Sequence, residues 1–472
     1  MNANPNWTSP SFPPRGSGRP GVFETAQRGL WMPGERLDMS WEYDEQRTPR
    51  SILLGTDGKR MIGRSDDRHI ITMAGSRAGK SRSVLIPNLL RYRGSVVVID
   101  PKGELAQATA RARAAMGQRV FILNPFNVLN AGTHGHNPCA ELLRSPKETL
   151  SADAAQLADA LIIESKDPHW TDSAKNLITG LVLHAVTADR KNLSLGAVRR
   201  QLSDTNELYG VLQVMALNEA LDGVIRNVGL SFLGKFSVSG GAPQANEEML
   251  SVLATVNAQT RPLDDLHAVF SRHDFDMEIF SASETPTTVY LILPATRIPT
   301  HARWLRLFVT QLLATLERHP IKRDNLPLWL ILEEFAALGY MRSIEAAAGY
   351  CAGFGVKLWT ILQDLTQIQT HYPKSWETFL GNAGIIQSFG NLDLTTTKYL
   401  SDLLGQTSII ELQKNTSTAA QRSHGDNGVR HNLRLVPLLS PPEIALYFAR
   451  ETMRQLVMVP GELPIILQRL NV

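Results

Sequence analysis

The chain has few cysteines, little net charge and no long apolar run. Its cysteines, Cys139 and Cys351, lie far apart in 472 residues and lack metal-ligand spacing, so the sequence supports neither a disulfide framework nor a zinc site. No apolar stretch approaches the ~20 residues that cross a bilayer, and the N-terminus is polar and proline-rich where a signal peptide has its apolar core. We therefore expect a cytoplasmic protein with no transmembrane segment in this chain.

The composition limits the class of protein more than its partners. A net charge of +3 does not by itself indicate a polyanionic partner, although a basic channel can exist within a nearly neutral total. The hydrophobic content of 43% and charged content of 20% are typical of a globular protein. At this length we expect two or more domains.

The N-terminal part, residues 1–50, combines many Pro, Gly and Ser residues with no hydrophobic periodicity. This pattern predicts a mostly irregular arm. Trp7, Trp31 and Trp41 are candidates for anchoring the arm to the body of the protein or to a neighbouring subunit.

Apolar, β-branched runs alternate with helical patterns in residues 51–139 and again in residues 276–472, which predicts an α/β fold with a mainly parallel central sheet. The expected strands are His69–Met73, Ser95–Ile99, Arg119–Leu123, Val289–Leu293, Leu328–Leu332, Val356–Leu362, Ile385–Ile386, Ile409–Ile410, Leu456–Met458 and Ile465–Leu467. Between residues 140 and 275 helical spacing replaces the strands, so we expect an all-helical inserted domain. The polar segment 414–432 is expected to be a solvated loop.

The segment AGSRAGKS, residues 74–81, follows one expected strand and precedes an expected helix. Successive backbone N–H groups and a helix N-terminus would form a concave, positive site for phosphates, which is the context of a phosphate loop that binds ATP with Mg²⁺. Lys80 would meet the β- and γ-phosphates, Gly79 would allow close backbone approach, and Ser81 would ligate Mg²⁺. The expected nucleotide-binding residues are Gly75, Ser76, Arg77, Ala78, Gly79, Lys80, Ser81 and Arg82. The first glycine of the G-x-x-x-x-G-K-[ST] pattern is Ala74 here, and the alternative is a chance glycine turn.

A phosphate loop also needs carboxylates at the end of a neighbouring strand. Glu333 and Glu334 follow the expected strand 328–332, so we expect Glu333 to face the Mg²⁺ and Glu334 to polarise the attacking water. Gln363 ends the strand 356–362, where a polar side chain can sense the γ-phosphate. The simpler interpretations are a solvated pair of carboxylates and a turn glutamine.

Further candidates carry weaker signals. Asp100 and Glu104 follow another expected strand and would either assist at the nucleotide site or simply form a turn. Trp170, in the motif Asp167-Pro168-His169-Trp170, would stack on a base or, more simply, anchor the start of a helix. An arginine from a neighbouring subunit is a usual component of ring ATPases, and the candidates are Arg297, Arg303, Arg306 and Arg342.

Several local motifs together resemble one family, the TraG-like coupling ATPases of type IV secretion. They are AGSRAGKS (74–81), VVVIDPKGEL (96–105), DPHWTDSAKNLITGLVLH (167–184), VYLILP with HARWLRL (289–307), LILEEFAALG (330–339), AGFGVKLWTILQDLTQI (352–368) and WETFLGNAGIIQSFG (376–390). They occur in the family's order over nearly the whole chain after residue 60. The resemblance implies a RecA-like P-loop NTPase domain carrying an all-helical domain, and matches Lys80, Ser81, Glu333, Glu334 and Gln363 to the family's phosphate, Mg²⁺, acidic and sensor positions.

The resemblance further implies a homo-hexamer around a DNA path, at the cytoplasmic face of the bacterial inner membrane, that drives relaxase-bound DNA or a protein substrate into a type IV secretion channel. The sequence departs from the family in lacking membrane-spanning helices, in having Glu333 where Asp is usual, and in having no arginine in residues 349–352. Two alternatives stay open. One is a cytoplasmic DNA pump of the FtsK or HerA kind, and the other is a substrate-docking scaffold that nucleotide binding merely stabilises.

Overall fold

The computed structural model describes residues 22–25, 37, 39–163, 168–321, 326–414 and 429–471. It contains two compact units, which we call unit 1 (Met1–Tyr92 with Trp359–Val472) and unit 2 (Arg93–Leu358). The sequence predicts different boundaries, with a separate helical domain at residues 140–275, and this division stays a prediction.

In the sheet of unit 1, the strand that precedes the phosphate loop lies among the parallel strands. Its strands follow the order β3 (Met61–Arg64), β2 (Ile52–Thr56), β16 (Ile465–Gln468), β15 (Arg454–Met458), β12 (Ala383–Phe389), β4 (His69–Ala74) and β11 (Val356–Leu362), of which β11 belongs to this unit from Trp359 onward. β4 is parallel to both β11 and β12, whereas β15, β16, β2 and β3 pair antiparallel. Every residue of β4 is buried, as expected for a strand whose two faces are both covered.

Short helices connect these strands, namely α1 (Ile86–Leu89), α14 (Leu365–His371), α15 (Trp376–Gly381), α16 (Leu394–Leu404) and α18 (Pro441–Tyr447). Asp364 and Asp393 begin α14 and α16, because each side chain accepts a backbone N–H of the first helical turn.

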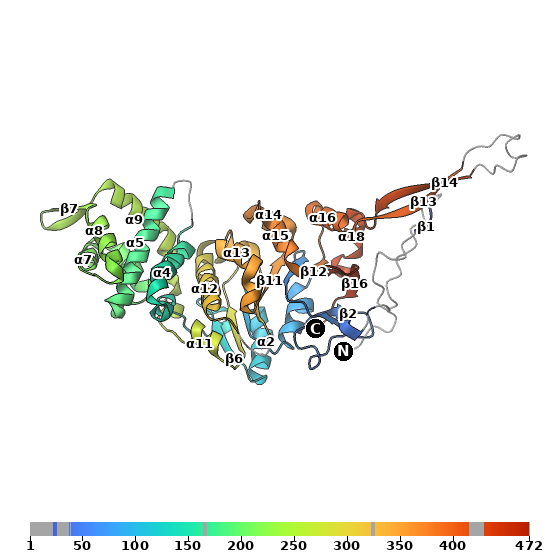
Figure 1. The fold of residues 1–472 in the computed structure, drawn as a ribbon, viewed down its shortest axis with the longest axis horizontal. Coiled ribbons are helices and arrows are strands. Elements are labelled where there is room, and N and C mark those ends of the chain that lie inside the picture. Colours follow the sequence, from blue (N-terminus) through green and yellow to red (C-terminus); the bar gives the residue numbers. More distant parts are fainter. Residues whose placement is uncertain are drawn as a thin grey trace, which may run out of the picture. The chain divides into compact units, whose positions relative to one another are not determined.

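A separate sheet in unit 1 joins β1 (Val22–Thr25), β13 (Gln406–Lys414) and β14 (Val429–Pro437). β13 and β14 pair in register out to Lys414 opposite Val429 (Figure 1). The expectation of a loop over residues 414–432 is therefore wrong at both ends, because cross-strand backbone hydrogen bonds form whatever the polarity of the side chains. Residues 415–428 lie outside the described part of the chain.

The sheet of unit 2 is parallel throughout its described strands, in the order β10 (Leu328–Leu332), β5 (Val96–Ile99), β9 (Thr287–Leu291) and β6 (Arg119–Leu123). β5, β9 and β10 are buried at every residue, which agrees with their continuous apolar sequences. The connecting helices are α2 (Glu104–Ala115), α12 (Ile298–Arg318) and α13 (Arg342–Tyr350).

Helices dominate the middle of unit 2, as the sequence predicts. They are α3 (Pro138–Glu141), α4 (Lys147–Leu161), α5 (Pro168–Thr187), α6 (Leu195–Ser203), α7 (Thr205–Met215), α8 (Val224–Leu233), α9 (Glu247–Thr260), α10 (His267–Phe270) and α11 (Met277–Ala282). The largely buried α5 contacts α4, α8 and α9, and these helices form one group drawn in green shades in Figure 1.

This region is not purely helical, because β7 (Phe236–Ser239) and β8 (Ala242–Ala245) form an antiparallel hairpin. Gly240 and Gly241 connect the strands, both with positive φ, which is the conformation that a two-residue hairpin turn requires. The Gly-Gly pair is thus a signal of a hairpin that helical spacing alone does not reveal.

Of the three N-terminal tryptophans, Trp41 lies in the described part. It is 3% exposed, and the guanidinium of Arg64 lies 4.5 Å from its ring centroid, so it anchors its segment to β3. Trp7 and Trp31, like most of the expected arm, fall outside the described residues.

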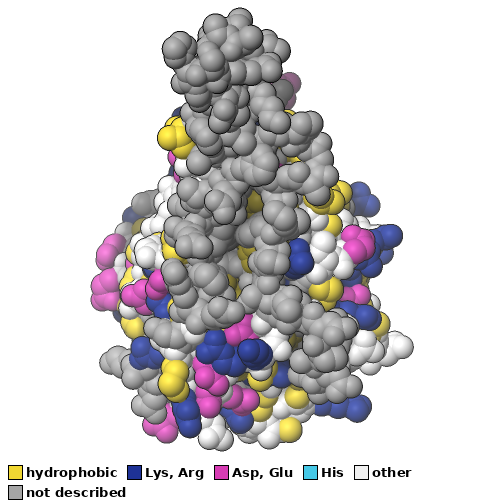
Figure 2. Space-filling model, turned by 90° about the vertical axis from the view of Figure 1, so that its right-hand side faces the viewer, with side chains coloured by type: hydrophobic (Ala, Val, Ile, Leu, Met, Phe, Trp, Pro, Cys, Tyr) yellow, Lys and Arg dark blue, Asp and Glu magenta, His cyan; other side chains and the backbone are white. Residues whose placement is uncertain are grey.

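The surface agrees with the small net charge. On the face shown in Figure 2, the described Lys and Arg side chains are interspersed with Asp and Glu side chains. No helix among the described residues combines the length and hydropathy needed to span a bilayer.

Asn88 joins the helix after the phosphate loop to β2, and its replacement provides a test of the fold. Its buried side chain accepts the N–H of Leu53 at 2.8 Å and donates to the carbonyls of Leu53 and Val84. We expect Asn88→Ala to lower the free energy of unfolding by about 3 kcal/mol, because the backbone groups of Leu53 lose their buried partner. Denaturant unfolding followed by circular dichroism measures this loss. The exposed Asn206→Ala is the control, and equal stability of the two variants would contradict the prediction.

Candidate nucleotide-binding site

The expected order of strand, loop and helix is present around residues 74–81. The loop leaves β4 after Ala74 and turns back on itself, with the Ala78 N–H donating to the Gly75 carbonyl at 3.1 Å. Arg77 and Gly79 adopt positive φ values of 57° and 91°. A single π-helical turn, Ser81–Leu85, then starts the helix. The loop is therefore a compact turn at the carboxyl end of a buried strand, where ligands bind in parallel sheets.

Gly75 packs against the backbone of the segment that follows β12. Its N–H donates to the Phe389 carbonyl at 3.2 Å, and a Cβ atom at Gly75 would lie 1.9 Å from the carbonyl oxygen of Gly390. A Cβ atom at Gly390, whose φ is +66°, would in turn lie 2.6 Å from Cβ of Ala78. Glycine is needed at position 75 because two backbone segments touch there, whereas Ala74 still belongs to the strand and pairs with Phe389.

Arg469, directly after β16, contacts the phosphate loop through its side chain. Its side chain is 3% exposed, and its Nη1 donates to the carbonyl of Ala78. Its Nη2 donates to the carbonyl of Arg450 at 2.6 Å, and the guanidinium lies 4.5 Å from the ring centroid of Phe389. Burial lowers the pKa of Arg469 to about 10, so the group stays charged at neutral pH. Sequence patterns did not indicate Arg469, because a single arginine after a terminal strand matches no motif.

Gln363 lies at the same edge of the unit 1 sheet as the phosphate loop. It follows Leu362, which is opposite Met73 in the parallel pair β11 and β4. Its carbonyl accepts Nδ2 of Asn391 at 2.8 Å, and its N–H donates to Oε1 of Gln367 at 2.8 Å. These bonds fix the backbone from which the expected sensor side chain emerges.

In unit 2, Glu333 and Asp100 follow paired residues of neighbouring parallel strands. Leu332 of β10 is opposite Ile99 of β5, so the two carboxyl groups emerge at one sheet edge. Glu333 is 7% exposed and Asp100 is fully buried. Burial raises the pKa of Asp100 to about 6, although its Oδ2 accepts the N–H of Ala106 at 2.8 Å.

The two interpretations of the turn after β5 can now be compared. Asp100 holds the start of α2 through Ala106, which is the structural role, while its Oδ1 is buried without a hydrogen-bond partner among the described residues. Glu104 lies in the first turn of α2 with an exposed side chain. Of the two, Asp100 therefore has the position and the unsatisfied oxygen that a role beside Glu333 requires.

Glu334 has an unusual backbone for its residue type. Its φ of 58° places it in the left-handed region, and its carbonyl accepts the N–H of Ala337 at 2.8 Å. Such a conformation costs a non-glycine residue roughly 1–3 kcal/mol and is concentrated at functional sites. The turn changes the chain direction immediately after Glu333, so the two glutamates do not continue the alternation of a strand.

The comparisons with known proteins identify the family. Residues 33–471 match the family model described as type IV secretory system conjugative DNA transfer. The chain belongs to this family. The family predicted from the local motifs is thus confirmed.

Related proteins agree with this assignment. The chain is 27% identical over 451 residues to protein VirD4 of Agrobacterium fabrum, which covers 93% of this chain and 64% of that protein. It is 27% identical over 402 residues to the conjugal transfer protein TraG of Escherichia coli, covering 80% of this chain and 61% of TraG. The chain therefore spans less than two thirds of the length of these curated relatives.

Solved structures confirm the predicted RecA-like P-loop NTPase fold. The bacterial conjugative coupling protein TrwBdeltaN70 in its unbound form has a TM-score of 0.66 at 16% identity, covering 90% of this chain and 89% of that chain. The plasmid coupling protein TrwB in complex with ADP and Mg²⁺ has a TM-score of 0.61 at 15% identity, covering 86% of this chain and 85% of that one.

The four candidate arginines of this family member differ in their surroundings. Arg306 donates to the carbonyls of Leu338 and Tyr340 at 2.9 and 2.6 Å, so it holds the segment that follows Glu334. Arg303 is half-buried, which lowers its pKa, and Arg297 lies over the ring of Phe126. Arg342 is exposed at the start of α13. Which of them acts on a neighbouring subunit stays a prediction.

Trp170 fits the simpler of its two interpretations. It lies half-buried in the first turn of α5, and its ring meets that of His169 edge-on with centroids 4.8 Å apart. Asp167 lies outside the described residues. A role in base stacking thus receives no support from these contacts.

The structure therefore brings the expected residues together in two sets. The loop that starts at Gly75 lies with Gln363 at one sheet edge of unit 1. In unit 2, Glu333 follows its strand at the same sheet edge as Asp100, and Glu334 is the next residue after it in the chain. Their roles toward a nucleotide stay predictions. The set in unit 1 gains Gly390 and Arg469, which the sequence did not indicate.

The contact between Gly75 and Gly390 predicts the effect of one methyl group. Gly75→Ala would force the loop and the segment after β12 apart, because Cβ would overlap the Gly390 carbonyl. Such overpacking costs about 1–3 kcal/mol, so we expect about tenfold weaker binding of a fluorescent ATP analogue. Gly381→Ala is the matched control, since a Cβ atom at Gly381 meets nothing within 4 Å. Equal affinities of the two variants would disprove a fixed loop.

The position of Arg469 predicts a role in holding the phosphate loop. We expect Arg469→Ala to weaken nucleotide binding by about tenfold, because the Ala78 carbonyl loses a charged hydrogen-bond donor worth about 1.5–3 kcal/mol. Arg469→Lys should restore part of the affinity. Isothermal titration with ATP and Mg²⁺ measures both, with the exposed Arg434→Ala as the control. Wild-type affinity in Arg469→Ala would show that the loop needs no support there.

Proposed function

We propose that this chain is a Mg²⁺-dependent ATPase of type IV secretion that recruits relaxase-bound DNA, or a protein substrate, and drives it into the conjugation channel. The observation that carries the proposal is the family match over residues 33–471 in a chain that retains a compact phosphate loop. Its relatives are named for conjugal transfer, and TrwB has been solved with an ATP analogue and with ADP and Mg²⁺.

The loop has the residue types that bind a triphosphate. The turn from Gly75 to Gly79 is compact and glycine-containing, and the helix begins directly after Lys80, so backbone N–H groups and a lysine occur together. Lys80 would bind the β- and γ-phosphates, and Ser81 would ligate Mg²⁺. When bound, Mg²⁺ would neutralise the charge that develops on the phosphate oxygens.

The remaining roles belong to side chains at strand ends. Glu333 would hold Mg²⁺ through water, Glu334 would orient and polarise the attacking water, and Gln363 would respond to the presence of the γ-phosphate. The positive φ of Glu334 supports its assignment, because strained backbone is maintained where function requires it. A carboxylate one methylene longer than aspartate at position 333 still offers the oxygen ligands that Mg²⁺ prefers.

The proposed assembly is a homo-hexamer at the cytoplasmic face of the inner membrane, with DNA, a relaxase and channel subunits as partners. The family match favours this coupling role over a cytoplasmic pump of the FtsK or HerA kind. A docking scaffold with little hydrolysis is the remaining alternative. It rests on Glu333 in place of aspartate and on the unidentified trans-acting arginine.

Two variants separate the motor from the scaffold. We expect Lys80→Ala to lose both ATP binding and turnover, and Glu334→Gln to bind ATP normally while its turnover falls by about 10²-fold or more, since it lacks the group that activates water. The measurement is the rate of phosphate release with and without DNA, on a preparation of known oligomeric size.

The exposed Glu377→Gln is the control and should match the wild type. A wild-type oligomer that binds ATP but shows no turnover, with or without DNA, while binding a relaxase tightly would contradict the motor and support the scaffold.

A further inference from the structure

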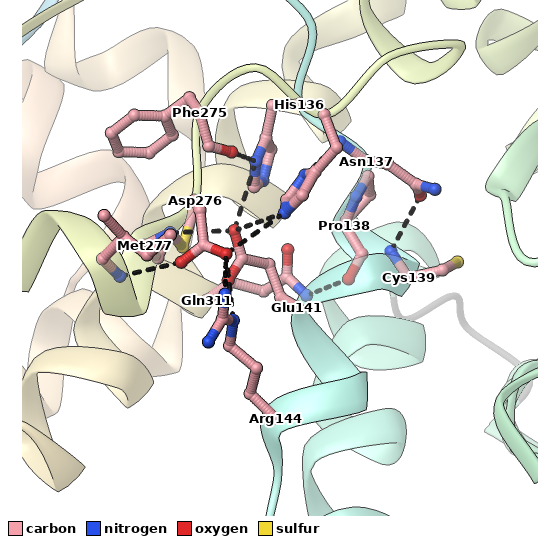
Figure 3. A network of polar contacts seen from close by, with 12 residues as sticks. His136, Asn137, Pro138, Cys139, Glu141, Arg144, Phe275, Asp276, Met277 and Gln311 are labelled. Atoms are coloured by element: carbon pink, nitrogen blue, oxygen red, sulfur yellow. Dashed lines mark hydrogen bonds and ion pairs between the residues drawn. The ribbon is translucent and has the colours of Figure 1, made fainter.

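Unit 2 contains a largely buried cluster of two histidines and a glutamate, to none of which a role is assigned above, and Figure 3 labels two of its members, His136 and Glu141. His136 and Glu141 come from the segment before α4, and His273 comes from the segment after α10. Glu141 Oε1 lies 3.5 Å from Nδ1 of His136 and 3.8 Å from Nε2 of His273. One potential ligand atom from each residue lies within 4.8 Å of the others. Ligand atoms around a tetrahedral ion at about 2.0–2.1 Å are separated by about 3.4 Å, so only small movements would close the site.

His136 is the least satisfied member of the cluster. It is 2% exposed, and its Nε2 has no hydrogen-bond partner among the described residues. Its Nδ1 faces two acceptors, the Phe275 carbonyl at 3.2 Å and the carboxylate of Glu141. Oε1 of Gln311, which is also buried, likewise has no hydrogen-bond donor among the described residues. A neutral imidazole carries one proton, so one of its two nitrogens still faces acceptors without a hydrogen to donate, and a bound cation would satisfy that nitrogen.

The two carboxylates of this region, Asp276 and Glu141, have different partners. The neighbouring Asp276 is already paired with Arg144, with Oδ2 at 2.7 Å from Nη2 and 2.9 Å from Nε. Glu141 instead accepts the backbone N–H of Met277 at 3.0 Å. A bound dication would compensate for the burial of this carboxylate.

We propose that His136, Glu141 and His273 form a binding site for a divalent transition-metal ion, with zinc the best match to two imidazoles and one carboxylate. With the ion on Nδ1 of His136, the opposite Nε2–H can donate to Oε1 of Gln311, which satisfies both orphaned atoms in the manner of a metal-bound histidine. His273 would bind through Nε2, which leaves the ring proton on Nδ1. That Nδ1 now accepts the Asn137 N–H at 3.2 Å, so on metal binding this exposed N–H would have to exchange the ring nitrogen for a water molecule as its acceptor.

The ion would connect the two segments that lead into and out of the helical region. Backbone bonds already link them, since the His136 N–H donates to Val269 and the N–H groups of Asp274 and Phe275 donate to Gly135. A metal bridge at this point would add a further link between these two segments. The sequence did not reveal the site, because Glu141 and His273 are far apart in the chain and metal-ligand spacing is a local signal.

The test uses the full chain, without nucleotide or Mg²⁺, stripped with EDTA and dialysed. We expect it to take up one Zn²⁺ per chain, measured by mass spectrometry of the metal, and to melt several degrees higher with Zn²⁺ than with EDTA. Co²⁺ in its place should give the visible absorption of a four-coordinate site. His273→Gln and Glu141→Gln should each weaken Zn²⁺ binding by more than about tenfold.

The exposed His267→Gln is the matched control and should keep stoichiometric Zn²⁺ and the full shift in melting temperature. His273 is 26% exposed at its side chain, so its variant is expected to fold, and its melting temperature in EDTA shows whether it does. The proposal is wrong if the wild type binds no stoichiometric Zn²⁺. It is equally wrong if folded His273→Gln and Glu141→Gln keep wild-type affinity, which would mean adventitious binding at other histidines. Neither result bears on ATP turnover.

Discussion

The phosphate loop of unit 1 depends on a contact between two backbone segments, at Gly75 and Gly390. A loop that offers its N–H groups to a ligand cannot use all of them internally, so it must be held by its carbonyls and by the neighbouring chain. The Gly75 N–H is bound by the Phe389 carbonyl, and the Ala78 carbonyl is bound by Arg469. Elements from three distant parts of the chain thus fix one short turn.

The other candidate residues are positioned by the ends of parallel strands. In a parallel sheet every strand presents its carboxyl end at one edge, so a side chain placed just after a strand is brought beside its neighbours without any special motif. Gln363 and the loop share such an edge in unit 1, and Glu333 and Asp100 share one in unit 2. At the second edge the carboxyl group of Asp100 is buried, and one of its oxygens accepts the Ala106 N–H while the other has no hydrogen-bond partner among the described residues.

The helical region adds a different kind of constraint at its base. The segments around His136 and His273 approach each other closely enough for two imidazoles and a carboxylate to share one buried space. Burying such groups is unfavourable unless hydrogen bonds or a cation compensate for the lost hydration. The ion pair with Arg144 compensates for the lost hydration of the Asp276 carboxylate. Nε2 of His136 has no such hydrogen-bond partner among the described residues.

The sequence by itself determined the α/β class, most strands, the phosphate loop and the family, because these depend on local periodicity and on short motifs with fixed spacing. The helical spacing of the surrounding residues did not reveal the hairpin at Gly240-Gly241, which depends on a local turn with two positive φ angles. The polar composition did not reveal the strand ends at Lys414 and Val429, because backbone pairing does not require apolar side chains. Only the tertiary structure decided that Gly75 must lack a side chain, that Arg469 supports the loop, and that His136, Glu141 and His273 meet. Each of these facts depends on contacts between residues that are distant in the chain, and no pattern in a linear sequence records which distant backbone or side chain will be the neighbour.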